Sequence, residues 1–170
     1  DRRDCGISLY VLLGQGELID QVPPDVRLLN PAFSRSSVLS RRGRGELTRH
    51  VLAAFFRNGG CLLKAGGALS QLPAMLRRGR LQPDKLLWRA VAEGGLRFEE
   101  EYDLAVAWIE GGSAYYVADH VKARKKKAVV HIAYESAGYT EKMDRGCFDR
   151  YETIFAVSEE TKAHFLALYP

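Results

Sequence analysis

The chain has 170 residues and a net charge of +4; 46% of its residues are hydrophobic and 27% are charged. These values are ordinary for one globular domain, and no apolar run approaches the ~18 residues of a membrane span. The three cysteines, Cys5, Cys61 and Cys147, include no CxxC pair, so the sequence supports neither a disulfide framework nor a structural zinc site. We therefore expect a cytosolic protein with reduced cysteines.

Residues 1–45 predict two short strands followed by a long connection. We expect a strand at 5–13, a turn at 14–16, a short helix at 17–21, a strand at 26–29 and an exposed connection at 30–45. The turn contains Gly14 and Gly16 and resembles half of a phosphate-binding loop. GxG alone is a weak signal, and a plain turn is the simpler interpretation.

Residues 46–95 predict a helical insertion between strands. Apolar residues follow helical spacing at 46–58 and again at 84–93, and a weaker helix is predicted at 61–76. Gly59 and Gly60 are expected to end the first of these helices. The insertion contains no recognisable catalytic constellation.

Residues 102–170 predict alternating strands and helices. The expected elements are strands at 102–108, 127–132 and 153–157, helices at 114–121, 144–150 and 159–168, and a loop at 133–143. The first strand is continuously apolar after Asp103, which is typical of a strand buried on both faces. Together these elements predict a three-layer α/β/α Rossmann-like sandwich with a mostly parallel sheet and helices on both faces.

The positive charge is concentrated in two clusters. They comprise Arg35, Arg41, Arg42, Arg44 and Arg49, and then Lys122, Arg124, Lys125, Lys126 and Lys127. Such clusters can bind nucleic acid or an anionic membrane surface, but cations are also common at the solvated ends of helices. No aromatic residues are interleaved with them, so base stacking has no support. We expect the second cluster to close a helix before a strand.

Several motifs in residues 102–170 resemble a known family. They are YDLAVAWIEGG at 102–112, KKKAVVHIAY at 125–134, GY at 138–139 and VSEETKAHF at 157–165. This combination closely resembles the amino-terminal domain of retaining GT-B glycosyltransferases of the glycosyltransferase-4-like family. These are bacterial enzymes that build surface polysaccharides and lipopolysaccharide. Residues 7–29 match the start of the same domain more loosely.

The resemblance implies a two-domain enzyme with a cleft between Rossmann-like halves. The amino-terminal half would bind a glycan or lipid-linked acceptor, and the carboxyl-terminal half would bind the nucleotide-sugar donor. We expect residues 1–170 to form a single amino-terminal domain with the helical insertion at about 46–95. The first strand, its glycine-rich loop and the donor-binding half are expected to be absent, so this chain alone should be inactive. Neither a metal nor another cofactor is expected, and the cytoplasm or the inner face of the membrane is the expected location.

Candidate substrate-binding residues lie where the three strands end, because ligands of parallel α/β sheets collect at the carboxyl ends. They are Glu110, Gly111 and Gly112 after the first strand, His131 and Glu135 after the second, and Ser158 after the third. The catalytic residues stay unassigned, since the sequence contains no HExxH, GxSxG or complete phosphate-binding loop.

Each candidate has a structural alternative. His131 could hydrogen-bond an acceptor hydroxyl or a donor phosphate, or be a buried histidine satisfied by backbone groups. Glu135 could bind sugar hydroxyls or be a solvated loop carboxylate. Gly111 and Gly112 could leave room for a ligand, or they could simply make a tight turn before a helix. Ser158 is expected to cap a helix, and the N–H groups beside it could hold an anion.

Two other functions stay open. The first is a non-catalytic α/β module that binds an anionic membrane surface or nucleic acid through the basic clusters; the transferase itself needs no nucleic acid. The second is a small-molecule-binding Rossmann-like domain, which would require a complete glycine loop that the sequence lacks.

Overall fold

The computed structural model describes residues 5–37, 39–57, 69, 73, 83–134, 137–144 and 146–170. These residues belong to two compact units, Asp1–Ala53 and Ala54–Pro170. Every strand pair among them is parallel, which confirms the predicted α/β class with parallel sheets. No helix in this described part combines the length and the apolar character that crossing a bilayer requires.

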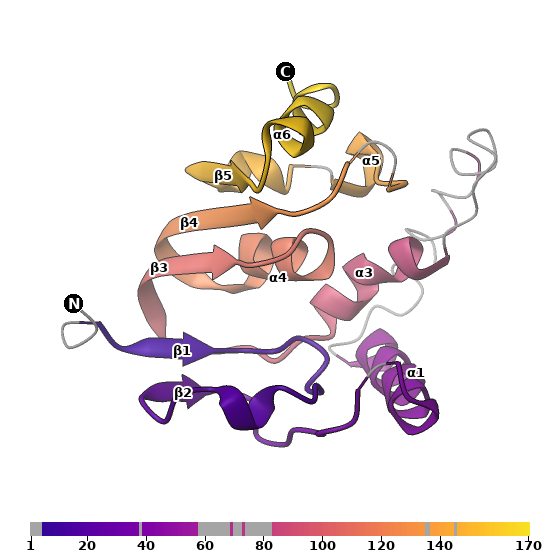
Figure 1. Cartoon of the computed structure of the whole chain (residues 1–170), viewed down its shortest axis with the longest axis vertical. Coiled ribbons are helices and arrows are strands. Elements are labelled where there is room, and N and C mark those ends of the chain that lie inside the picture. The colour runs from indigo at the N-terminus through magenta and orange to yellow at the C-terminus, as the bar shows by residue number, and fades with distance from the viewer. Residues whose placement is uncertain are drawn as a thin grey trace. The chain divides into compact units, whose positions relative to one another are not determined.

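The first unit contains a pair of short parallel strands (Figure 1). β1 (Ile7–Leu9) pairs with β2 (Val26–Leu28), so both predicted strands exist, although β1 is shorter than expected. The short helix predicted between them is a 3-10 turn, η2 (Ile19–Gln21). Beyond the strands, the Asn30 side chain accepts from the N–H of Val11 and donates to its carbonyl, both at 2.9 Å. This amide closes the end of the strand pair.

The glycine turn after β1 is a plain turn. Gly14 has a φ of +62°, the left-handed region that favours glycine. Its N–H donates to the carbonyl of Val11 at 2.8 Å, and the N–H of Gly16 donates to the carbonyl of Ser34 at 2.9 Å. Because both N–H groups already have backbone acceptors, this turn does not offer them to a phosphate.

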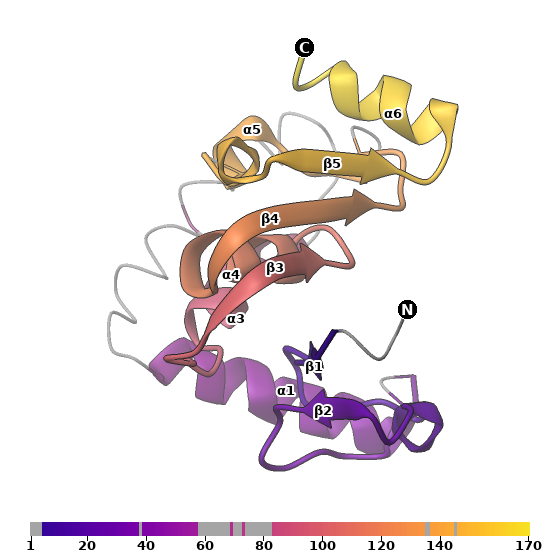
Figure 2. The ribbon, with the colours of Figure 1, turned by 90° about the vertical axis from the view of Figure 1, so that its left-hand side faces the viewer.

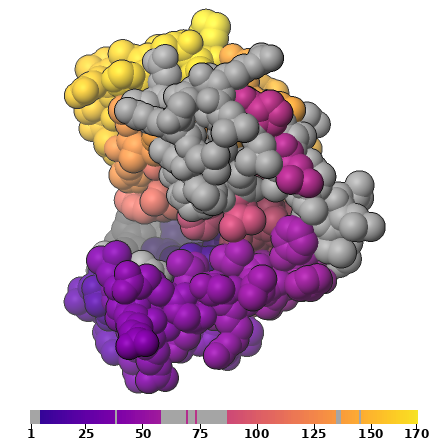
Figure 3. Space-filling model, turned by 90° about the vertical axis from the view of Figure 1, so that its right-hand side faces the viewer, coloured from indigo at the N-terminus to yellow at the C-terminus, as the bar shows by residue number. Residues whose placement is uncertain are grey.

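Helix α1 (Arg41–Phe56) begins at Arg41 rather than at Glu46, so the predicted connection at 30–45 is wrong in its last residues. The cause is a cap: the Oγ of Ser40 accepts from the N–H of Gly43 at 3.0 Å. Atoms of α1 form part of the surface shown in Figure 3, and Phe56 at its end is 67% exposed. The helix predicted at 61–76 lies almost entirely outside the described residues.

The second unit is built on a three-stranded parallel sheet in the order β3-β4-β5 (Figures 1 and 2). Its strands are β3 (Glu101–Ala107), β4 (Lys122–Val130) and β5 (Thr153–Ala156). Its helical elements are α3 (Pro83–Glu93), α4 (Gly112–His120), α5 (Glu141–Asp144), η3 (Phe148–Arg150) and α6 (Glu159–Leu166). Helix α4 connects β3 to β4, and α6 follows β5.

The second basic cluster forms the first half of β4, so the prediction that it closes a helix is wrong. Acidic residues on neighbouring segments form ion pairs with the cations of this strand. Lys122 pairs with Glu99 at 2.6 Å, Arg124 with Asp103 at 3.2 Å, and Lys125 with Glu152 at 3.5 Å. These pairs are exposed and each contributes little stability, but they remove like-charge repulsion along the strand.

The two faces of the three-stranded sheet differ in burial. Side chains alternate between faces along a strand, and the covered face carries Ala107, Ala128 and Val130, each at most 1% exposed. Helix α4 packs against this face (Figure 2). On the other face, Leu104 is 48% and Phe155 is 48% exposed. The predicted burial of β3 on both faces is therefore wrong, because the described helix α4 covers only one of them.

A buried carboxylate organises the core beside α4. Asp144 is 1% exposed; its Oδ1 accepts from the hydroxyls of Tyr115 and Tyr134, both at 2.7 Å. Its Oδ2 accepts from the hydroxyl of Tyr169. Burial raises the pKa of Asp144, and the three hydroxyl donors oppose that rise. The side chain of Asp144, at the end of α5, therefore forms hydrogen bonds with three other segments: α4, the loop after β4 and the segment after α6.

Arg89 connects α3 to the same core. Its guanidinium donates to the backbone carbonyls of Met143 at 2.9 Å and Asp144 at 2.5 Å. It also pairs with Asp119 at 2.8 Å and lies 4.3 Å from the centre of the Tyr115 ring. A single arginine therefore combines hydrogen bonds, an ion pair and a cation–π contact.

The helix predicted at 144–150 is instead two short elements, α5 and η3. Thr140 starts α5 early, because its Oγ1 accepts from the N–H of Met143 at 3.2 Å. As a result Asp144 ends the helical turn rather than beginning it, and its side chain is directed into the tyrosine cluster.

Candidate functional site

Glu110 and His131 meet where β3 and β4 end. His131 directly follows β4, and Glu110 lies in the turn between β3 and α4. The Glu110 side chain is 4% exposed, and its Oε2 accepts a hydrogen bond of 3.0 Å from the backbone N–H of His131. The fold therefore brings together two residues that the sequence had placed at neighbouring strand ends.

The histidine ring is left accessible by this arrangement. The side chain of His131 is 35% exposed, so the alternative of a buried histidine is wrong. Its Nδ1 lies 3.9 Å from Glu110 Oε2, which is too long for a hydrogen bond. Glu110 thus holds His131 mainly through its backbone, while the imidazole can exchange hydrogen bonds with a hydroxyl group of a ligand.

Gly111 is required by the turn that leads into α4. It has a φ of +73° and a ψ of −122°, a conformation that side chains other than glycine rarely adopt. A β carbon at this position would overlap the hydroxyl of Tyr139 and lie 3.4 Å from Cδ1 of Trp88. Gly112 is buried as the first residue of α4. The tight-turn interpretation is confirmed, and substrate contact by either glycine stays a prediction.

Ser158 is a helix cap, as the sequence predicted. Its Oγ accepts from the N–H of Thr161 at 3.1 Å and donates to Oγ1 of the same residue at 3.0 Å. Glu159 and Glu160 occupy the first turn of α6, at the positive end of the helix dipole. An anion bound there would meet two negative charges, so the geometry favours capping over anion binding.

Trp108 is the residue of this region that sequence reasoning missed. It directly follows β3, is 72% exposed, and its ring centroid lies 6.3 Å from that of His131. The sequence places it last in a strand that was expected to be buried on both faces. Its position immediately before the strand-ending turn was the available signal. Glu135, the other predicted site residue, lies outside the described residues.

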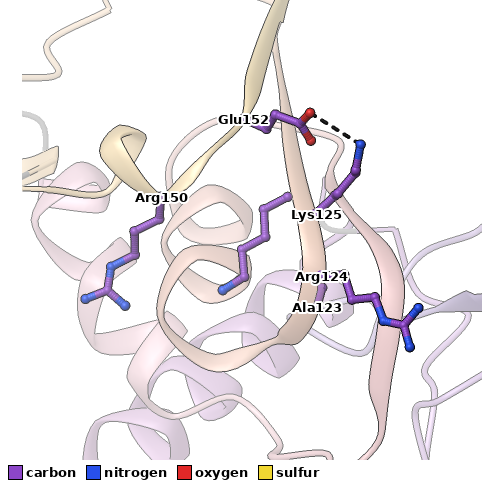
Figure 4. A pocket seen from close by; sticks show the side chains of 6 residues that line it. Ala123, Arg124, Lys125, Arg150 and Glu152 are labelled. Atoms are coloured by element: carbon purple, nitrogen blue, oxygen red, sulfur yellow. Dashed lines mark hydrogen bonds and ion pairs between the residues drawn. The ribbon is translucent and has the colours of Figure 1, made fainter.

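A basic hollow lies toward the opposite end of β4 (Figure 4). It has a volume of about 640 Å³ and is lined by Ala123, Arg124, Lys125, Lys126, Arg150 and Glu152. In Figure 4 the guanidinium groups of Arg124 and Arg150 point to opposite sides, while Lys125 reaches Glu152. The cations therefore do not converge on one point. Of the predicted site residues that the structure describes, none lines this hollow.

A second polar cluster lies where α3 and α4 end. Ligand atoms of Glu93, Asp119 and His120 lie within 4.8 Å of one another, close enough to hold a metal ion. However, Arg89 pairs with Asp119 at 2.8 Å, and a guanidinium nitrogen of Arg97 lies 3.3 Å from His120 Nε2. These guanidinium groups already supply the positive charge that a metal would bring, so the cluster is best described as an ion-pair network.

His120 should make folding stability depend on pH. Burial lowers the pKa of His120, Arg97 adds to the effect, and Glu93 and Asp119 oppose it. Because the folded state disfavours the protonated ring, stability should fall as the pH drops below the ordinary value of 6.5. Urea unfolding at about pH 7.5 and about pH 5.5 tests this, with His120→Gln as the comparison. We expect a smaller loss in the variant; an equal loss in both proteins would contradict the assignment.

The chain matches no protein-family model, no curated protein and no solved structure. Membership of a family is therefore not shown by comparison. Two observations bear on function: the geometry at the ends of β3 and β4, and the motif pattern of residues 102–170.

Proposed function

We propose that this chain is the amino-terminal, acceptor-binding domain of a retaining GT-B glycosyltransferase of the glycosyltransferase-4-like type. The enzyme would transfer a hexose from a nucleotide sugar to a glycan or lipid-linked acceptor during bacterial surface polysaccharide synthesis. One observation carries the proposal: a buried carboxylate, Glu110, holds the accessible His131 at neighbouring ends of parallel strands. Ligands of open α/β sheets bind at this edge. The motif resemblance supplies the choice of sugar transfer among the activities that such a fold can host.

In this proposal His131 hydrogen-bonds an acceptor hydroxyl through its exposed imidazole. Glu110 acts as a positioning residue, because it fixes the backbone of His131 from a buried site. The nucleotide sugar would be held by a second, carboxyl-terminal domain, and the acceptor would lie between the two. The reaction would need neither a metal nor another cofactor, and it would take place in the cytoplasm or at the inner face of the membrane.

We also expect a second helical layer on the face of the sheet that α4 leaves open. A three-layer α/β/α sandwich has helices on both faces of its sheet, and α4 supplies one layer. The exposed side chains of Leu104, Val106 and Phe155 form the kind of apolar face that a second layer would cover. A second layer would leave the strand ends, where Glu110 and His131 meet, open to the acceptor.

Replacing His131 with alanine should weaken acceptor binding about tenfold, the equivalent of one lost hydrogen bond of ~1.4 kcal/mol. The test is calorimetric titration of the 170-residue chain with short oligosaccharides and with a polyprenyl-phosphate-linked sugar. His50→Ala is the matched control, because His50 lies on α1 in the first unit, whereas His131 belongs to the second. Far-UV circular dichroism confirms that each variant is folded.

Two results would count against the proposal. One is that the wild-type chain binds no glycan at any accessible concentration. The other is that His131→Ala and His50→Ala bind as tightly as wild type. Strongly salt-dependent binding of nucleic acid or anionic vesicles, with no glycan binding, would favour the non-catalytic module instead.

A further inference from the structure

Trp108 is exposed in a way that folding of the described residues does not explain. Burying a large apolar side chain stabilises a fold, yet Trp108 is 72% exposed. It lies on the face of the sheet that also carries Leu104 and Val106, which are 48% and 43% exposed. Of these three residues, Trp108 is the most exposed.

Trp108 lies beyond the last paired residue of β3, unlike Leu104 and Val106, which lie within the strand. The last paired residue of β3 is Ala107, opposite Ala128, so Trp108 lies beyond the ladder at the edge of the sheet. A helical layer that covered Leu104 and Val106 would not need to extend over this edge. The indole belongs to the strand-end region of Glu110 and His131 rather than to the sheet face alone.

The surroundings of Trp108 combine apolar and polar chemistry. The His131 ring lies 6.3 Å away between centroids, with an angle of 51° between the ring planes. Next along the chain, Ile109 is 51% exposed. An aromatic plane beside one hydrogen-bonding ring is an arrangement that suits an amphipathic, disc-shaped ligand.

We propose that Trp108 is the stacking platform for a pyranose ring of the acceptor, with His131 contacting a hydroxyl at the rim of that ring. A pyranose presents C–H groups on its faces and hydroxyls around its edge. The C–H groups carry partial positive charge and are attracted to the negative face of the indole, while the hydroxyls require hydrogen-bond partners. This inference rests on the proposed function, and it assigns the ring-binding surface to a residue outside the Glu110–His131 pair.

The test follows the two indole N–H signals of the 170-residue chain, from Trp88 and Trp108, by NMR during titration with methyl pyranosides and short oligosaccharides. Trp88→Phe assigns the signals. We expect the Trp108 signal to shift in a saturable way and the Trp88 signal to stay in place. Trp108→Ala removes the stacking ring and should weaken binding at least about tenfold. Trp108→Tyr retains an aromatic ring and should weaken binding about threefold or less.

Phe155→Ala is the matched control, because Phe155 is an aromatic residue on the same face and is 48% exposed. The Phe155→Ala variant should bind sugars with the same affinity as the wild-type chain. If His131→Ala weakens binding about tenfold but Trp108→Ala leaves it unchanged, the stacking role is wrong and the proposed function stands. If Trp108→Ala and Phe155→Ala weaken binding equally, or if Trp108→Ala changes the oligomeric state, the face is a docking surface and the stacking role is wrong. Absence of sugar binding by the wild-type chain overturns the proposed function and this inference together.

Discussion

Asp144→Ala should lower the free energy of unfolding by about 3–5 kcal/mol, the cost of removing one partner from a buried polar network. The carboxylate accepts from the hydroxyls of Tyr115, Tyr134 and Tyr169, and alanine would leave all three without this acceptor. Tyr115 and Tyr134 are at most 1% exposed, so water cannot replace the lost bonds without opening the core. Equilibrium unfolding in urea measures the change.

Two further variants distinguish the effect of lost hydrogen bonds from the effect of lost side-chain volume. Tyr169→Phe removes one hydroxyl donor and keeps the ring, so we expect a loss of only about 1 kcal/mol. Asp144→Asn should fall between the two, because burial raises the pKa of Asp144 and a neutral side chain is cheaper to bury. If Asp144→Ala lost less than about 1 kcal/mol, the carboxylate would be a peripheral feature of this core.

The network also predicts the direction of a pH effect. With its folded pKa raised above the ordinary 3.8, Asp144 takes up its proton more readily in the folded state than in the unfolded chain. The contribution of Asp144 to stability therefore decreases as the pH rises above 3.8. This trend is opposite to that of His120, which is why each is measured as a difference between wild type and its own variant.

The elements that the sequence predicted well are those with strong local signals. β2, β5 and α6 lie close to their predicted bounds, because apolar runs define the strands and Ser158 supplies a visible cap. The neighbouring ends of β3 and β4 follow from the alternation of strands and helices, so the proximity of Glu110 and His131 was predictable.

The features that the sequence did not predict depend on partners distant along the chain. The cations at the start of β4 pair with acids that are distant in the sequence, such as Glu99 and Glu152. The role of Asp144 depends on tyrosines from separate segments, and no local pattern marks an acidic residue for burial. Exposure of Trp108 depends on which face α4 covers. In each case tertiary contacts, rather than local propensity, decide the outcome.

Gly111→Ala should cost about 2–6 kcal/mol, since backbone strain at positive φ and overpacking each cost about 1–3 kcal/mol. Gly111 has a φ of +73°, and an added β carbon would overlap the hydroxyl of Tyr139. Tyr139 cannot easily move aside, because it is 2% exposed and its ring stacks on Tyr134 at 4.7 Å between centroids. The variant should also displace the turn that carries Glu110 and thereby loosen the backbone of His131.

Gly45→Ala provides the matched control, since Gly45 lies within α1 and nothing approaches within 4 Å of an added β carbon. We expect this second variant to gain about 0.5–1 kcal/mol, as glycine is unfavourable inside helices. Thermal and urea unfolding of both variants give the comparison, and amide NMR shifts at Glu110 and His131 report on the site. Equal stabilities for Gly111→Ala and wild type would mean that the turn before α4 can change its conformation, and the rigid placement of the Glu110–His131 pair would then have to be abandoned.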